Sequence, residues 1–550
     1  MVDKKLYAKY LQLWPNQDKD GTPVNWSDNS LVGIIQSVAG IIDQHKTEAR
    51  SPILGGSLVG INYNELIANA AIPPRGESLE QVLQRFQELV IGHPFQTEFY
   101  MTNAIALPTK VSLAAMFLGA YLNSNPLWDI YGPAAAQAEV EVTSMVSELV
   151  GYNKMISGGY LIYGGTGGQE AALSIGIEKV APNSKVNGVP NNIYVLSSDV
   201  AHFSVESVVA NSGIGTNKNI IVRSNWDNSM DIGDLEKKMR SIFTQGGEIA
   251  VIYATTGTTD GFGIDQVSEI KKISDSLAKE FDKAYNPHIH ADLAMGGLFP
   301  VFNNYDFQNN PIGIEGPALH DIKSITERMS QLKDADSLVL DFHKLGQTPK
   351  MCPLFLVKDA KDFALVDRGK EASPYTGNRE YGEYHTSWTK ETSRLYSSIA
   401  ALANLKSFGI EGYQVYLAHL VERAVQLKRG LDKLEGVSVL NMDVPGPVAV
   451  FRFYSDSNSM DRELNGMATK EEVEQTNAYM GFAMNELFGK NRNQIFFGDT
   501  KRYRHIDTLE GDRTPLYAIK AFMISPYTTS STIEKTVEYV RSIRASTQMR

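Results

Sequence analysis

The sequence predicts an α/β protein whose large domain is built on a mostly parallel sheet. From about residue 150 to 360, short apolar and β-branched runs alternate with helical stretches. Such alternation is typical of a parallel sheet that helices cover on both faces. The chain has 550 residues, 43% of them hydrophobic and 21% charged, which suits a globular protein with two or three packed units.

Residues 1–95 are expected to form an N-terminal helical segment. Ser30 to Gln44 has a helical pattern. Ser78 to Ile91 is clearly amphipathic, with apolar residues at 3.6-residue spacing and Ser78 as a candidate cap. Two further helices are expected over Thr109 to Leu122 and Ala134 to Leu149, at the start of the next domain.

The large domain is expected over residues 96–400. Ligands collect at the carboxyl ends of the strands in such sheets, which directs the search for chemistry to those positions. The seven expected strands are Tyr160 to Tyr163, Asn192 to Leu196, Ile220 to Val222, Ile249 to Ala254, His288 to Ala291, Ser337 to Leu340 and Leu354 to Val357. The helices between them are Gln169 to Val180, Val205 to Asn211, Ile232 to Phe243 and Gln266 to Phe281.

Residues 401–550 are expected to form a small C-terminal α/β domain after a long helix over roughly Leu395 to Leu434. Few strands alternate with helices here, which favours a smaller unit. The strands are Val437 to Leu440, Val448 to Phe453 and Ala518 to Ile524, and the helices are Lys470 to Phe488 and Ser531 to Ile543.

Charge and cysteine content exclude several classes of function. The formal charge of −11 argues against nucleic acid or an anionic membrane as partner, because both need a basic face. No run of eighteen apolar residues exists, and the N-terminus lacks the apolar core of a signal peptide. The lone Cys352 excludes an intrachain disulfide and a multi-cysteine metal site. A cytoplasmic location is the simplest expectation.

The glycine-rich run from Gly164 to Gln169 lies between an expected strand and an expected helix. Glycines let the backbone approach an anion, and a helix start offers free N–H groups. The run lacks the Lys-Ser/Thr of a Walker loop and the pattern of a dinucleotide site. It predicts a phosphate cradle, although such turns also serve packing alone.

Other strand ends each carry one polar side chain that could take part in chemistry. His202 follows the second strand, and Thr255 and Asp292 follow the fourth and fifth. Lys344 follows the sixth strand, where a partly buried amine suits attack on a carbonyl. Each has a plainer explanation: His202 as a helix cap, Thr255 as a turn residue, Lys344 as a surface lysine.

His288 and His290 share a strand face with Asp292, which raises the question of a metal. We do not expect one, because no second ligand cluster with recognisable spacing appears. Instead, the phosphate cradle, imidazole, threonine, carboxylate and lysine together suit an aromatic, phosphorylated cofactor that bears an aldehyde.

Five ordered motifs resemble the group II pyridoxal-phosphate-dependent amino acid decarboxylases. The likeness covers residues 90–400 well and the remainder loosely. It implies the type I fold of pyridoxal-phosphate enzymes, with a seven-stranded large domain and a small C-terminal domain, and a homodimer. The motifs are Gly-Thr-Gly-Gly-Gln-Glu-Ala-Ala, Asp-Val-Ala-His-Phe-Ser-Val-Glu, Ala-Thr-Thr-Gly-Thr-Thr, His-Ala-Asp-Leu-Ala-Met-Gly-Gly and Asp-Phe-His-Lys.

The resemblance implies a role for each matching residue. Lys344 would hold pyridoxal phosphate as a Schiff base and then surrender it to the substrate amine. Asp292 would pair with the pyridine nitrogen, so that the ring acts as an electron sink. His202 would stack on the ring and help position the substrate carboxylate, and Thr255 would lie beside the ring.

The same resemblance assigns the phosphate to Gly167, Gly168 and Gln169, with His343 in support. Gln169 stands where Ser or Thr is commoner in the family. The phosphate network is therefore expected to be rearranged.

A loop tyrosine that reprotonates the product carbanion is also implied. Tyr375 stands at about the right separation from the lysine, with Tyr381 and Tyr384 as rivals. Arg394 resembles the family arginine that contacts carboxylates of the substrate or cofactor. The plainer alternatives are loop packing for the tyrosines and a structural ion pair for Arg394.

The residues around the lysine most resemble the diaminobutyrate and lysine decarboxylase branch. These are Asp341 and Phe342 before His343-Lys344, and Gln347 soon after. We therefore expect a small-molecule L-amino acid substrate that yields an amine and CO2. One alternative is a pyridoxal-phosphate carbon–carbon lyase similar to sphingosine-phosphate lyase. A catalytically inactive regulatory relative is a second.

Overall fold

The computed structural model describes residues 3–11, 13–15, 29–367, 389–391 and 393–548. These residues fall into two compact units. The first comprises Met1–Phe99 with Asn491–Ile495, and the second comprises Tyr100–Lys490 with Phe496–Arg550. Among the described residues, no helix combines the length and apolarity that a membrane crossing needs.

The first unit is helical, as expected. Its helices are α1 (Lys4–Leu11), α2 (Asn29–Gln44), α3 (Tyr63–Asn69) and α4 (Leu79–Val90). The predicted cap of α4 is confirmed: Ser78 and Gln81 form a reciprocal capping box, which satisfies two backbone N–H groups at the helix start.

The core of the second unit is a seven-stranded sheet in the order β2-β8-β7-β6-β5-β3-β4. Strands β3 to β7 run parallel to their neighbours, whereas β8 is antiparallel to both β7 and β2. All seven predicted strands are confirmed within two residues at each end. They are β2 (Gly158–Leu161), β3 (Ile193–Ser198), β4 (Asn219–Val222), β5 (Glu248–Thr255), β6 (His288–Asp292), β7 (Ser337–Asp341) and β8 (Pro353–Val357).

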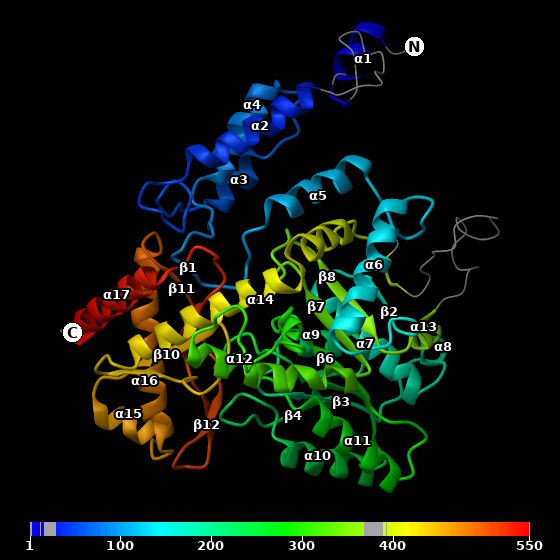
Figure 1. The fold of residues 1–550 in the computed structure, drawn as a ribbon, viewed down its shortest axis with the longest axis vertical. Helices are drawn as coiled ribbons and strands as arrows, with labels where there is room; N and C mark the ends of the chain where they lie inside the picture. The colour runs from blue at the N-terminus through cyan, green and yellow to red at the C-terminus, as the bar shows by residue number, and fades with distance from the viewer. Residues whose placement is uncertain (1–2, 12, 16–28, 368–388, 392, 549–550) are drawn as a thin grey trace. The chain divides into compact units, whose positions relative to one another are not determined.

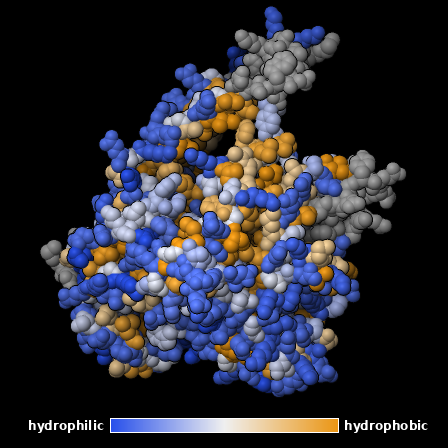
Figure 2. Space-filling model, in the orientation of Figure 1, coloured by the Kyte–Doolittle hydropathy of each residue, from blue (hydrophilic) through white to orange (hydrophobic). Residues whose placement is uncertain are grey.

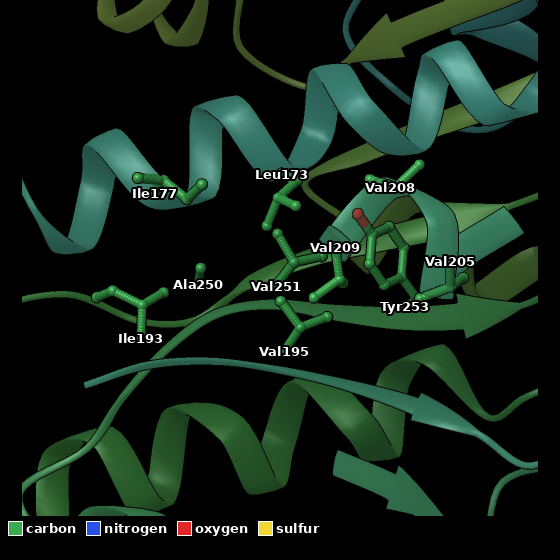
Figure 3. Close-up of a cluster of buried hydrophobic side chains, with 10 residues drawn as sticks. All are labelled: Leu173, Ile177, Ile193, Val195, Val205, Val208, Val209, Ala250, Val251 and Tyr253. Carbon is green, nitrogen blue, oxygen red and sulfur yellow. The ribbon is translucent and has the colours of Figure 1, made fainter. Parts of the chain in front are cut away.

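Helices pack on this sheet on either side (Figure 1). Helix α7 crosses β5 to β8, and Figure 3 shows Leu173 and Ile177 of α7 against Val195, Val251 and their neighbours in the sheet. The helices of this region are α5 (Lys110–Leu122), α6 (Pro133–Leu149), α7 (Gly164–Val180), α8 (Ser184–Asn187), α9 (Ser204–Asn211), α10 (Ile232–Thr244), α11 (Val267–Glu280), α12 (Gly316–Met329) and α13 (Phe363–Val366).

A second sheet, of order β1-β11-β14-β10-β9, lies in the C-terminal part of the same unit. Its strands are β1 (Tyr100–Met101), β9 (Val437–Val439), β10 (Val448–Phe453), β11 (Phe496–Thr500) and β14 (Ala518–Phe522). The sequence did not predict β1, β11 or the hairpin β12 (His505–Asp507) and β13 (Arg513–Pro515). The helices are α14 (Ser398–Leu431), α15 (Ser457–Leu464), α16 (Lys470–Phe482) and α17 (Ser530–Gln548).

The predicted long helix is α14, but it is broken at Gly409, whose φ of 58° and ψ of −167° are not helical. Glycine tolerates this backbone region because it has no Cβ.

Candidate active site at the carboxyl ends of the large sheet

Three predicted site residues lie at one edge of the large sheet. Strands β5, β6 and β7 are adjacent and parallel, and Thr255 at the end of β5 pairs in register with Asp292 at the end of β6. Strand β7 ends at Asp341, and Lys344 follows one turn later. The carboxyl ends of parallel strands share an edge, so the fold brings Thr255, Asp292 and Lys344 together.

Asp292 is 7% exposed and both of its carboxylate oxygens accept hydrogen bonds. The backbone N–H of Ala294 donates to Oδ1 at 3.1 Å. The side-chain amide of Gln169 donates to Oδ2 at 2.8 Å. Both donors are neutral, so these contacts orient the carboxylate without cancelling its charge. Such an anion suits a protonated ring nitrogen.

Lys344 pairs with a carboxylate whose role the sequence did not reveal. Its Nζ lies 2.9 Å from Oδ2 of Asp341, and its side chain is 22% exposed. Asp341 is 2% exposed. Its Oδ1 has no hydrogen-bond partner among the described residues. The amine is thus held at the edge of the sheet by a buried anion.

His202 faces the same group of charges. Its Nδ1 lies 2.6 Å from the hydroxyl of Ser204, at the start of α9. Burial lowers the pKa of the imidazole, and Lys344 adds to that direction, while Asp292 and Asp341 oppose it. The neutral ring is therefore favoured at neutral pH, which suits stacking against a planar ring.

The glycine-rich run forms the first turns of α7, not a loop before it. The helix begins at Gly164, with no side-chain cap from Tyr163. A Cβ on Gly168 would lie 2.5 Å from Val339, so only glycine lets this turn lie directly on β7. The first N–H groups of a helix have no partner within it and attract anions.

The start of α7 determines where the three residues predicted to bind the phosphate lie. Gly167 belongs to the first turn of α7, whereas Gly168 and Gln169 lie one turn further in. The side chain of Gln169 is 1% exposed and bonds to Asp292 and Ser204. The Gln169 amide therefore already has two protein partners, and the phosphate contacts of Gly167, Gly168 and Gln169 stay predictions.

His343 is also held by protein groups. The backbone N–H of Cys352 donates to its Nδ1 at 3.3 Å, and its Nε2 lies 3.6 Å from Oδ2 of Asp341. Both ring nitrogens of His343 thus contact protein groups, and its support of the phosphate stays a prediction. Gln347, which helped to indicate the substrate branch, donates to the hydroxyl of Tyr416 and packs in the interior.

Arg394 forms a buried ion pair with Glu139. The Nη2–Oε2 distance is 2.6 Å, and the two side chains are 2% and 0% exposed. Glu139 also accepts the backbone N–H of Leu161 at 2.7 Å. The structure thus shows the ion pair that was the plainer alternative, and contact with substrate stays a prediction. Tyr375, Tyr381 and Tyr384 lie outside the described residues.

Sequence reasoning missed the parts played by Ser204 and Asp341. Ser204 stands inside a family motif, two residues after His202, but its hydroxyl had no predicted role. Asp341 served only as a signature of a branch, although a carboxylate three residues before a lysine at a strand end is a clear signal for an ion pair. Among the described residues, no cluster of three or more His, Cys, Asp or Glu is placed to hold a metal.

This donor set fits pyridoxal phosphate. Asp292 would supply an anion for the ring nitrogen, Lys344 an amine for the aldehyde, and His202 a neutral ring for stacking. The uncapped start of α7 supplies N–H groups for the phosphate, and a Cβ on Gly165 would lie 3.6 Å from Asp341 Oδ2, so this helix start borders the lysine site. The fold and the site together define a pyridoxal-phosphate enzyme of fold type I.

The family profile described as "Pyridoxal-dependent decarboxylase conserved domain" matches residues 62–454. The chain belongs to this family, and it is a pyridoxal-phosphate-dependent amino acid decarboxylase. It is 25% identical over 404 residues to an L-2,4-diaminobutyrate decarboxylase of Acinetobacter baumannii, covering 69% of this chain and 73% of that one. An L-2,4-diaminobutyrate decarboxylase of Rhizobium meliloti is 24% identical over 335 residues, covering 61% of this chain and 60% of that one.

Solved structures share the fold at low identity. The mouse CSAD structure in apo form has a TM-score of 0.75 at 16% identity, covering 94% of this chain and 99% of that one. The glutamate decarboxylase domain of a Vibrio parahaemolyticus protein titled diaminobutyrate-pyruvate transaminase and L-2,4-diaminobutyrate decarboxylase has a TM-score of 0.70 at 16% identity. It covers 98% of this chain and 99% of that one. The predicted fold class is confirmed.

Proposed function

We propose that this enzyme converts an L-diamino acid to the corresponding amine and CO2. The observation that carries the proposal is the meeting of Asp292, Lys344 and His202 at one sheet edge. The substrate class is supported by the residues Asp341 to Lys344 and by the names of the two bacterial relatives.

Each residue at the site would hold one part of the cofactor. Lys344 would hold the aldehyde carbon, Asp292 would pair with the ring nitrogen, and the start of α7 around Gly167 would receive the phosphate. Thr255 lies beside Asp292 and borders the ring. When bound, pyridoxal phosphate supplies a cationic ring that accepts the electron pair of the bond that breaks.

The protein's own part in decarboxylation is to place the carboxylate and to return a proton. His202 covers the ring and positions the substrate carboxylate, so that its bond to the α-carbon is the one that breaks. Tyr375 is our candidate for the donor that protonates the α-carbon afterwards. Neutral donors hold both oxygens of Asp292 and orient its carboxylate.

Arg394 contacts the substrate in this proposal only if its pair with Glu139 opens. Arg394→Lys separates the two roles. A lost substrate contact raises KM with the melting temperature unchanged, whereas a purely structural role lowers the melting temperature with KM unchanged.

A homodimer completes the proposal. Figure 2 shows hydrophobic side chains gathered over α5, and a soluble surface rarely leaves such a face uncovered. In the first unit, α4 buries none of its residues, although it is amphipathic. The exposed apolar residues are Val111, Leu113, Phe117, Leu118, Tyr121 and Leu122 on α5 and Leu79, Phe86 and Leu89 on α4. A second copy of the chain is the proposed cover.

We also propose the cytoplasm as location, supported by a single, buried cysteine. The division into segments 1–95, 96–400 and 401–550 is proposed as well. The strands of the seven-stranded sheet come before residue 400. Those of the five-stranded sheet come after it, except for β1.

The test is release of CO2 from a panel of L-amino acids with added pyridoxal phosphate. We expect 2,4-diaminobutyrate or lysine to be turned over in preference to glutamate and aromatic amino acids, with amine and CO2 formed in equal amounts. Lys344→Ala should lose both turnover and the visible absorption of the bound cofactor.

Two outcomes would contradict the proposal. Formation of an aldehyde and phosphoethanolamine from a phosphorylated sphingoid base, without CO2, would show a carbon–carbon lyase. A colourless protein that binds no pyridoxal phosphate would show an inactive relative.

A further inference from the structure

Gln169, Ser204 and His202 form a chain of hydrogen bonds that starts at Asp292. The amide Nε2 of Gln169 lies 2.8 Å from Asp292 Oδ2, and its Oε1 lies 2.7 Å from the hydroxyl of Ser204. That hydroxyl lies 2.6 Å from Nδ1 of His202. Gln169 and Ser204 are 1% and 4% exposed, so water does not compete for these groups.

The direction of every bond in this chain is determined. A carboxylate only accepts hydrogen bonds, so Asp292 requires the NH2 side of the Gln169 amide. The amide oxygen therefore faces Ser204 and takes the single proton of its hydroxyl. The Ser204 oxygen can then only accept at the remaining 2.6 Å contact. His202 must donate to it from Nδ1.

A competing arrangement lies beside this one. The backbone nitrogen of Ser204 lies 3.3 Å from the same Nδ1. Nδ1 could accept a hydrogen bond from this N–H only if it carried no proton. The two arrangements exclude each other, because Nδ1 cannot donate and accept at once. The shorter contact prevails because Gln169 already takes the hydroxyl proton.

We propose that Gln169 and Ser204 are positioning residues that hold neutral His202 with its proton on Nδ1 and leave Nε2 bare. This inference rests on the proposed role of His202 toward the substrate carboxylate. It also explains why Gln169 stands where the family commonly has Ser or Thr: the longer side chain spans from Asp292 to Ser204.

The consequence is a dependence of substrate binding on pH. A bare Nε2 cannot donate a hydrogen bond to a carboxylate, so Nε2 of His202 holds the substrate carboxylate only in the fraction of enzyme whose imidazole is charged. The charged groups that face His202 are Asp292, Asp341 and Asp260, which favour its imidazolium, and Lys344, which opposes it. Burial outweighs the acids and lowers the pKa of His202 from its ordinary value of 6.5. The imidazolium is lost as pH rises, so KM should rise about tenfold per pH unit above that pKa.

The direct test is nitrogen NMR of the histidine-labelled apoenzyme, which needs no turnover. His202 is assigned as the neutral-ring signal that is absent from His202→Gln. We expect the wild type to show the proton on Nδ1. Ser204→Ala removes the 2.6 Å partner and leaves only the backbone N–H, so its proton should move to Nε2. Gln169→Leu frees the hydroxyl proton for Nδ1 and should give the same reversal.

Kinetics then separate positioning from a structural role. In Ser204→Ala the neutral ring already donates from Nε2, so KM should change less than about twofold over the pH range where the wild-type KM rises about tenfold. Ser204→Thr keeps the hydroxyl and should restore the wild-type tautomer and pH profile. Ser207→Ala, the same change at an exposed serine on α9, should match the wild type in both measurements.

The outcomes distinguish this inference from the proposed function. A proton on Nε2 in the wild type, or on Nδ1 in Ser204→Ala, overturns the inference even if the enzyme decarboxylates diamino acids. The expected tautomers in an enzyme that releases no CO2 from any amino acid leave the inference standing and overturn the function.

Discussion

The carboxylates that end β6 and β7 lie one strand apart and are both buried, yet the protein holds them in opposite ways. Asp292 takes hydrogen bonds on both oxygens from neutral donors, the backbone of Ala294 and the amide of Gln169. Asp341 faces a cation, Lys344, at 2.9 Å, with His343 further away at 3.6 Å. Its other oxygen has no hydrogen-bond partner among the described residues.

The difference shows how two buried carboxylates, Asp292 and Asp341, can serve different purposes at one edge of the sheet. A buried carboxylate is costly unless it is paired or hydrogen-bonded. Asp292 is solvated by dipoles, so its full charge stays available to a cationic ring nitrogen. Asp341 forms an ion pair with Lys344, so this contact restrains the amine.

The largest expected effect follows from loss of the carboxylate of Asp292. We expect Asp292→Asn to lower kcat about 1,000-fold, equivalent to about 4 kcal/mol, because a neutral amide cannot keep the ring nitrogen cationic. Lys344 is unaltered, so the visible absorption of bound cofactor should remain. Asp336→Asn, the same change near the opposite end of β7, is the control and should keep kcat within about twofold of the wild type. A wild-type kcat in Asp292→Asn would show that the ring nitrogen does not depend on this carboxylate.

A smaller effect, of opposite sign, is expected at Asp341. The ion pair with Asp341 holds Nζ of Lys344 at 2.9 Å, and attack on an aldehyde requires this contact to open. Asp341→Asn should therefore load pyridoxal phosphate about fivefold faster at neutral pH, since a partly exposed pair contributes on the order of 1 kcal/mol. Stopped-flow absorbance of apoenzyme mixed with cofactor measures this rate. Slower loading would mean that Asp341 positions the amine more than it restrains it.

The sequence predicts the strands and the edge at which these residues meet, for a physical reason. Strands buried on both faces are short apolar runs, so β3, β5, β6 and β7 are visible in the sequence, and the polar residue after each run marks the carboxyl edge. Lys344, Asp292 and His202 follow from this logic because each comes directly after such a run.

The remainder depends on contacts between distant parts of the chain. Gln169 and Asp292 are 123 residues apart, and nothing local indicates that the amide serves the carboxylate. The helix start at Gly164 overrides the low helix propensity of four glycines because α7 packs closely on β7. Strand β1 has two residues and exists only because β11 pairs with it from nearly 400 positions away.

The contrast between charged and neutral partners extends to buried lysines. Lys428 is 2% exposed and donates to the backbone carbonyl of Val444 at 2.6 Å, where Lys344 has a carboxylate. Burial lowers the pKa of Lys428 to about 8, although Asp321 and Asp443 oppose the change. In the unfolded chain the pKa of a lysine is about 10.4.

The sign of the pH dependence follows from this lowered value. Between about pH 8 and pH 10 the unfolded chain binds more protons at Lys428 than the folded chain, so this lysine makes folding more favourable as pH rises. Lys428→Met removes that gain, and its free energy of unfolding relative to the wild type should fall by about 1–3 kcal/mol between these two pH values. Urea unfolding at both pH values measures the change, and groups that titrate equally in both proteins cancel in the difference. Lys433→Met, at an exposed position nearby, should show no such change, and an equal difference at both pH values in Lys428→Met would contradict the burial argument.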